Sequence, residues 1–190
     1  MKKYLIAASL FAASLTGVTS AADYIVDYDG AHASINFRVQ HLGYSWLTGR
    51  FDKFSGKFSY DANNIAASKI EMTIDASSVN TNHAERNKHI KSDDFLDVNK
   101  FAEATFISSS VADKGDGKME IKGQLTMHGV SKAITIDAVK IGEGKDPWGG
   151  YRAGFSGTSE ITMKDFGIKM NLGPASAKVY FDLYIEGVRQ

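Results

Sequence analysis

The chain of 190 residues contains no cysteine and only 2 prolines. Without cysteine the fold has neither disulfide cross-links nor a thiolate nucleophile, so its stability must come from an apolar core, which a domain of this size can build. An excess of charge is also missing, because 22 basic side chains balance 22 acidic ones. This balance argues against nucleic acid as a partner.

No segment approaches the roughly 20 consecutive apolar residues that a membrane-spanning helix needs. The apolar stretch from Leu5 to Val18 follows the positively charged start Met1-Lys2-Lys3 and precedes the small residues Thr19-Ser20-Ala21. This order is typical of a secretory signal peptide. We therefore expect residues 1–21 to be cleaved on export and residues 22–190 to form a single domain without stable membrane insertion.

The domain is rich in alternating apolar and polar residues, the period that places one set of side chains on each face of a strand. Clear examples lie at residues 35–39, 70–74, 119–127 and 179–185. The pattern predicts about eight strands. They are expected near residues 23–29, 32–41, 47–60, 67–76, 104–112, 118–127, 132–142 and 151–163, with 177–187 as a further candidate for a ninth.

The apolar phase slips within residues 49–60, where Phe51 is odd and Phe54 even, and this slip predicts a bulge or bend. The turn residues of 113–117 and of His128-Gly129 predict two antiparallel hairpins.

One stretch predicts a helix. Asn82 can act as N-cap and Glu85 follows at the spacing of a capping box, so the helix is expected over His83–Lys91. A second short turn is expected after Asp93.

Many antiparallel strands with short turns and one inserted helix near residues 83–91 predict an all-β fold. Its architecture is an antiparallel up-and-down barrel of about eight strands, which leaves no exposed sheet edge. The alternation is compatible with two orientations, with the apolar set inside a water-soluble barrel or facing lipid as in an outer-membrane barrel. The lack of paired aromatic girdles favours the first.

Motifs for catalysis, metal binding and phosphate binding are absent from the sequence. There is no Gly-x-Ser-x-Gly elbow, no His-Glu-x-x-His pair and no phosphate-binding glycine loop. His32 and His41 are expected at strand ends with backbone hydrogen bonds, and His128 in a turn. We therefore assign no catalytic residue, no metal ligand and no cofactor.

Several longer stretches resemble the YceI-like family in order and spacing. HASINFRVQHLG at 32–43 precedes GRFDKFSG at 49–56, and SVNTNHAER at 78–86, GQLTMHG at 123–129 and RAGF at 152–155 follow. The resemblance covers essentially all of residues 22–190. It implies a lipocalin-like barrel, periplasmic in exported bacterial members, that holds a polyisoprenoid or similar long-chain amphiphile in an internal pocket without catalysis.

Alternation and this resemblance together assign a set of inward apolar side chains to ligand binding. The set is Ile35, Phe37, Val39, Ile70, Met72, Ile74, Ile121, Leu125, Phe155, Phe181 and Leu183. Arg86, Lys88 and Lys91 offer cations to a phosphate or quinone head group if the predicted helix borders the opening; a solvated helix face is the alternative.

Two other functions remain open. One is an enzyme that acts on a lipid or sugar at the barrel mouth through His83 or Glu85. The other is a barrel with a solid core that binds proteins through the loop of residues 142–150, where Trp148 would be an exposed anchor. The sequence also leaves open whether two copies associate as a homodimer.

Overall fold

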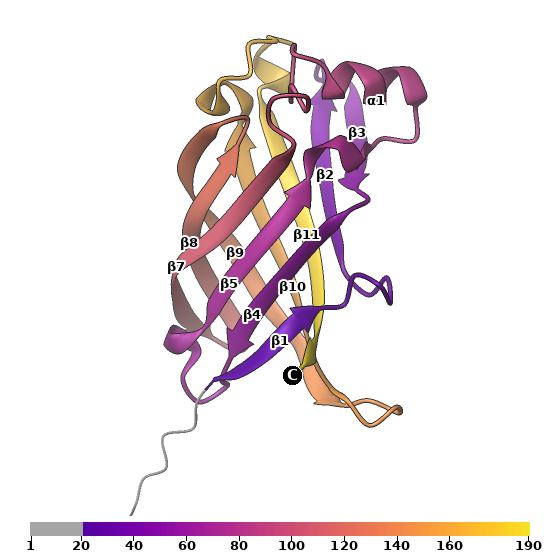
Figure 1. The fold of residues 1–190 in the computed structure, drawn as a ribbon. Coiled ribbons are helices and arrows are strands. Elements are labelled where there is room, and N and C mark those ends of the chain that lie inside the picture. Colours follow the sequence, from indigo (N-terminus) through magenta and orange to yellow (C-terminus); the bar gives the residue numbers. More distant parts are fainter. Residues whose placement is uncertain (1–20) are drawn as a thin grey trace, which may run out of the picture.

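The structure, a computed structural model, describes residues 21–190. The predicted signal peptide of residues 1–21 therefore lies outside the described residues, apart from Ala21. Strands of one antiparallel sheet close into a barrel of 8 staves, where a stave is one long strand or two strands in line (Figure 1). The α-helix α1 (Ala84–Lys91) lies at one end of the barrel (Figure 1).

Three staves are interrupted and five are continuous. The interrupted staves are β1 (Ala22–Val26) with β2 (Ser34–His41), β3 (Ser45–Phe51) with β4 (Phe54–Tyr60), and β5 (Lys69–Asp75) with β6 (Val79–Asn80). The continuous staves are β7 (Glu103–Gly115), β8 (Lys118–Met127), β9 (Val130–Lys145), β10 (Tyr151–Thr162) and β11 (Lys178–Arg189). The barrel closes because β1 and β2 both pair with β11.

The sequence predicts eight strands and a possible ninth, and the structure shows why both counts arise. The segments predicted at 23–29 and 32–41 lie in line along β11, so the nine predicted segments make eight staves.

The bend predicted within residues 49–60 is confirmed at Asp52 and Lys53, which separate β3 from β4. Their backbone N–H groups bond Ser78 instead of continuing the ladder. The inward-facing residues therefore have odd numbers before the bend and even numbers after it.

Both predicted hairpins are present. β8 and β9 are joined by His128 and Gly129, with φ of 52° and 72°. Positive φ at both central residues is the turn geometry that matches the twist of paired strands. β7 and β8 are joined through Asp116, which also has a positive φ of 53°.

The cap predicted for the helix is wrong by one residue. Asn82 has φ 58°, whereas an N-cap residue needs extended backbone, which His83 has at φ −150°. His83 Nδ1 accepts the N–H of Arg86 at 3.2 Å. The helix therefore begins at Ala84, and turns follow Asp93 as predicted.

The apolar set faces the barrel interior, which is one of the two orientations that the alternation allowed. The end beneath α1 and η3 (Met163–Phe166) is filled by side chains of a buried core. They are Val79, Leu96, Met163, Phe166 and Ile168.

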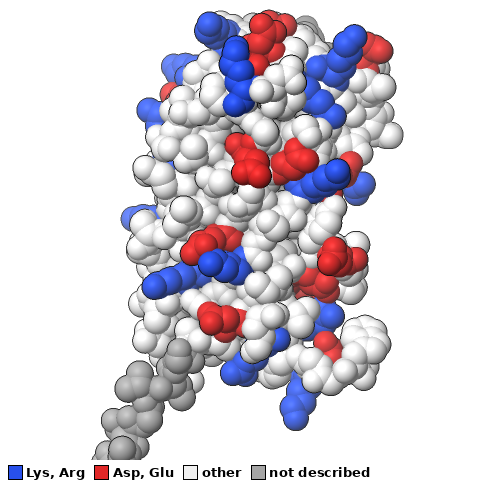
Figure 2. Space-filling model, viewed as in Figure 1, with Lys and Arg blue, Asp and Glu red and all other residues white. Residues whose placement is uncertain are grey.

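Basic and acidic side chains are interspersed on the face seen in Figure 2, without a large patch of one sign. Within residues 21–190, no helix has the length and apolar character needed to cross a membrane.

Candidate ligand-binding cavity

The barrel encloses a cavity of about 170 Å³ lined almost entirely by apolar side chains. All eight staves contribute lining residues, and β5 contributes three successive inward residues, Ile70, Met72 and Ile74. Met72, Met119 and Met127 all line it. Because methionine is unbranched and flexible, these walls can adapt to guests of different shape.

Nine of the eleven predicted ligand-binding residues line this cavity. They are Ile35, Ile70, Met72, Ile74, Ile121, Leu125, Phe155, Phe181 and Leu183. Phe37 and Val39 lie outside the lining, nearer the α1 end of β2. The Phe37 ring packs against Phe51 at 5.7 Å between centroids and covers Gly49, so Phe37 belongs to the packed core.

Further lining residues were not assigned from the sequence. They are Phe51, Phe58, Tyr60, Ala104, Phe106, Val111, Met119, Met127, Ile134, Ile136, Ala138 and Ile185, with small polar residues between them. Met119 and Met127 share the alternation of Ile121 and Leu125, and this signal would have found them. Phe58 and Tyr60 were obscured by the phase change at the bend.

Some of the polar residues that line the cavity lie at the end farthest from α1. This end lies at η1 (Ile65–Ala67), between β4 and β5, and is lined by Tyr60 and Ser68. Lys140 pairs in register with the inward Phe155, and its Nζ lies 5.2 Å from the centroid of the Tyr60 ring and 2.8 Å from Glu143 Oε1. Burial lowers the pKa of Lys140, but the Glu143 carboxylate and Tyr60 outweigh it, so the pKa lies above its usual value.

The three cations predicted to meet a head group do not line the cavity. Arg86 donates to the hydroxyl and the carbonyl oxygen of Thr81, each at 2.8 Å, and so ties α1 to the segment before it. Lys88 is exposed and Lys91 is half-buried on the same helix. The helix stands over the filled end of the barrel, so the condition attached to this prediction is not met.

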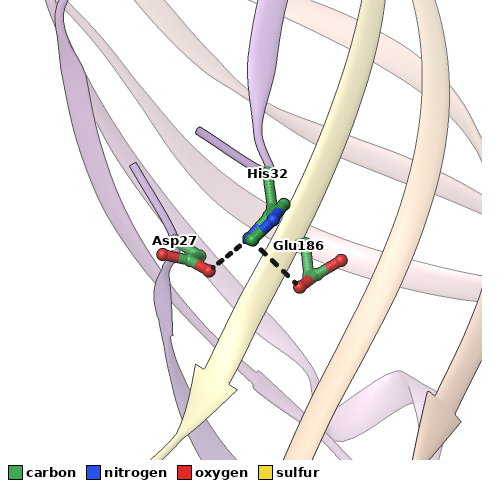
Figure 3. Close-up of side chains that lie close together, drawn as sticks. All are labelled: Asp27, His32 and Glu186. Atoms are coloured by element: carbon green, nitrogen blue, oxygen red, sulfur yellow. Dashed lines mark hydrogen bonds and ion pairs between the residues drawn. The ribbon is translucent and has the colours of Figure 1, made fainter. Parts of the chain in front are cut away.

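A polar cluster on the barrel wall joins residues far apart in sequence. His32 Nδ1 lies 2.8 Å from Asp27 Oδ2 and 3.9 Å from Glu186 Oε1 (Figure 3). Arg152 donates to Asp27, to Glu186 at 2.7 Å and to Asp146 at 2.9 Å. Hydrogen bonds from His32 and Arg152 hold the pKa of Asp27 at about 2. The cluster fastens the β1–β2 and β9–β10 loops to β11.

Asp27, His32 and Glu186 have the donor types of a metal site, and their ligand atoms lie within 4.8 Å of one another. Arg152 already bonds both carboxylates, however, and supplies the positive charge there. The His32 side chain therefore bonds a carboxylate, whereas the backbone hydrogen bond predicted for this residue is made by its N–H, which donates to the Asp27 carbonyl oxygen at 3.2 Å. His128 does bond a backbone group, the Phe166 carbonyl oxygen at 3.0 Å.

The residues of the two alternative functions also have defined places. His83 is occupied as the cap of α1 and Glu85 is exposed on the first turn, away from the cavity lining. Trp148 is exposed at 78%, in the loop between β9 and β10, with the Arg152 guanidinium 5.7 Å from its ring. An exposed tryptophan fits a binding surface, but the barrel core is not solid.

A closed antiparallel barrel around an apolar cavity is a lipocalin-like fold. The chain belongs to one family of such barrels: residues 26–187 match the model of the YceI-like domain. This confirms the resemblance seen in the sequence.

Known proteins agree with this assignment. A UPF0312 protein of Shewanella sp. (strain ANA-3) is 59% identical over 191 residues, covering 100% of both chains. The crystal structure of Campylobacter jejuni YceI protein has a TM-score of 0.73 and 29% identity, covering 85% of this chain and 96% of that one. A polyisoprenoid-binding domain from Saccharophagus degradans has a TM-score of 0.65 and 18% identity, covering 90% and 99%.

Proposed function

We propose that the protein is a periplasmic carrier or buffer that holds a polyisoprenoid or similar long-chain amphiphile in the barrel and performs no catalysis on it. The apolar cavity is the observation that carries this proposal. A polar interior would not bind an acyl or prenyl chain favourably, and a solid interior would leave no space for one. The ligand class is supported by the Saccharophagus degradans domain, which is described as polyisoprenoid-binding.

The size of the apolar contribution favours long chains. Burial of a methylene contributes about 0.8 kcal/mol, so ten carbons contribute roughly 8 kcal/mol and twenty roughly 16 kcal/mol. Association costs about 4–15 kcal/mol in lost freedom. Short chains are therefore expected to exchange and long chains to be retained.

The cavity must adapt to hold such a chain. Its volume of about 170 Å³ is close to that of the engineered apolar cavity of about 150 Å³ that stays dry and binds benzene. A long chain therefore needs flexible lining side chains, such as Met72 and Met119, to move aside.

Export is supported by the sequence of residues 1–21, which has the charge, apolar core and small residues of a signal peptide. The experiment that tests the whole proposal is to isolate the protein from the periplasmic fraction, extract it with organic solvent and identify the extract by mass spectrometry. We expect a stoichiometric long-chain lipid. Absence of lipid, together with no uptake of prenyl chains by the purified protein, would contradict the proposal.

A further inference from the structure

One polar group at the η1 end of the cavity has no partner. Ser68 is only 8% exposed, is the C-cap of η1 directly before β5, and is one of the residues that line the cavity. Among the buried side-chain oxygen and nitrogen atoms of residues 21–190, its Oγ alone lacks a hydrogen bond. Buried polar groups in folded proteins are almost always paired, so an unpaired hydroxyl on a residue of the cavity wall calls for a partner that the protein itself does not supply.

The charges around this hydroxyl are already balanced. Lys140, which reaches the same end, pairs with Glu143 at 2.8 Å, so the two together are neutral. The other lining residues are apolar apart from Tyr60, Gly157 and the serines at 59, 156 and 159, and none of them is charged. An ionised head group placed here would be buried without a free counter-charge, which is unfavourable, whereas a neutral oxygen would need only the one hydrogen bond that Ser68 can donate.

The opposite end of the barrel cannot take the head group inside. Val79, Leu96 and Phe166 fill it with packed apolar side chains, and the cations of α1 lie outside. The apolar tail of a guest would therefore point toward α1 and its polar end toward η1.

We propose that the η1 end is the subsite for the polar end of the ligand, and that it selects an uncharged hydrogen-bonding oxygen bound by Ser68 over a phosphorylated group. This inference rests on the proposed function and specifies its ligand class. A hydroxyl and a carbonyl share the required chemistry, and probes that carry each of them distinguish the two.

The test measures dissociation constants of the purified mature protein for four matched probes: geranylgeraniol, geranylgeranial, the corresponding hydrocarbon without oxygen, and geranylgeranyl phosphate. The variants are Ser68→Ala, Ser68→Cys as a second variant with a weaker donor, and Ser55→Ala as control. Ser55 is exposed on β4 and points away from the cavity. Ser68→Ala deletes an unpaired hydroxyl, so its melting temperature should equal or exceed that of the unmodified protein.

We expect the unmodified protein to bind the alcohol or the aldehyde about fivefold more tightly than the hydrocarbon, as one neutral hydrogen bond provides. The phosphate should bind more weakly than either. Ser68→Ala should abolish the preference without weakening hydrocarbon binding, Ser68→Cys should reduce it, and Ser55→Ala should retain it.

Two results would overturn the inference: an undiminished preference in Ser68→Ala, or tighter binding of the phosphate than of the alcohol. If all four probes bind equally well, the proposed function stands and only the head-group subsite is refuted. If no probe binds, the proposed function itself is refuted, and this inference with it.

Discussion

Met72 lies directly across from Gly56 on the neighbouring strand, and its sulfur would be only 2.1 Å from a β-carbon at residue 56. The missing side chain of Gly56 is therefore the space in which Met72 lies flat against the barrel wall. Phe106 uses Gly123 in the same way, at 2.4 Å. Inward glycines thus leave room for large neighbours to pack on the wall and keep the centre of the barrel open.

Gly56→Ala should push Met72 into the cavity and weaken the binding of a long-chain probe by about fivefold or more, which corresponds to the about 1–3 kcal/mol typical of overpacking. The Met72 side chain is flexible, but the new β-carbon would also lie 2.9 Å from the Glu71 backbone oxygen, so we expect some loss of stability as well. Affinity can be measured by displacement of a fluorescent lipid. The double variant Gly56→Ala/Met72→Ala should recover binding, because the displaced side chain is gone. Unchanged affinity in the single variant would refute this account of the glycine.

Ala138→Leu should fill part of the cavity, since Ala138 is buried and lines it. We expect a gain of about 0.5–2 kcal/mol in the free energy of unfolding and a marked loss of lipid uptake. The matched control is Ala153→Leu on β10, which is fully buried but outside the lining. In Ala153→Leu the extra volume should lower the free energy of unfolding by about 1–3 kcal/mol. Equal effects of the two variants on stability would contradict the cavity.

Asp27 should make stability depend on pH. Because its pKa is about 2 in the folded protein and 3.8 as the ordinary value, its contribution is complete above about pH 4 and is lost as the pH falls toward 2. We expect this contribution to be on the order of 1 kcal/mol, since the cluster remains partly open to screening by solvent. Urea unfolding at pH 7 should show Asp27→Asn to be destabilised, and the difference should vanish near pH 2. A difference that persists there would mean that the carboxylate charge is not what His32 and Arg152 recognise.

His83→Ala should remove the cap of α1 and destabilise the protein by about 1 kcal/mol. Lipid retention should remain unchanged, because the helix contributes nothing to the cavity lining. Thermal unfolding and lipid extraction of the same preparation measure both quantities. If the unmodified protein converts its bound lipid to a product and His83→Ala does not, the result would favour the enzyme hypothesis instead.

Alternation predicted the strands well because a period of two follows directly from the pleat of a single strand. It could not rank Phe37 against Phe181, which face each other across β2 and β11. Both point inward, yet only Phe181 lines the cavity, while Phe37 packs over Gly49. The difference depends on neighbours from other strands, which no local pattern contains.

The helix shows a similar division. The helix was predicted from the capping-box spacing of Asn82 and Glu85, but its first residue depended on the left-handed backbone of Asn82. The Asn80 side chain stabilises that backbone by accepting the Asn82 N–H. Arg86, Lys88 and Lys91 do lie on a helix, as predicted. They lie far from the cavity because the packed core fills the end of the barrel next to α1.

The amino-acid sequence by itself determined the β-rich fold and the face of each strand that turns inward, because these follow from local periodicity, and the order and spacing of its motifs carried the resemblance to the YceI-like family. Only the tertiary structure decided that the cavity lies toward η1, that Ser68 is left unpaired there, and that Arg152 gathers Asp27, Asp146 and Glu186. The reason is that period two sets the face of a residue, whereas its height in the barrel and its partners are set by closure between distant strands.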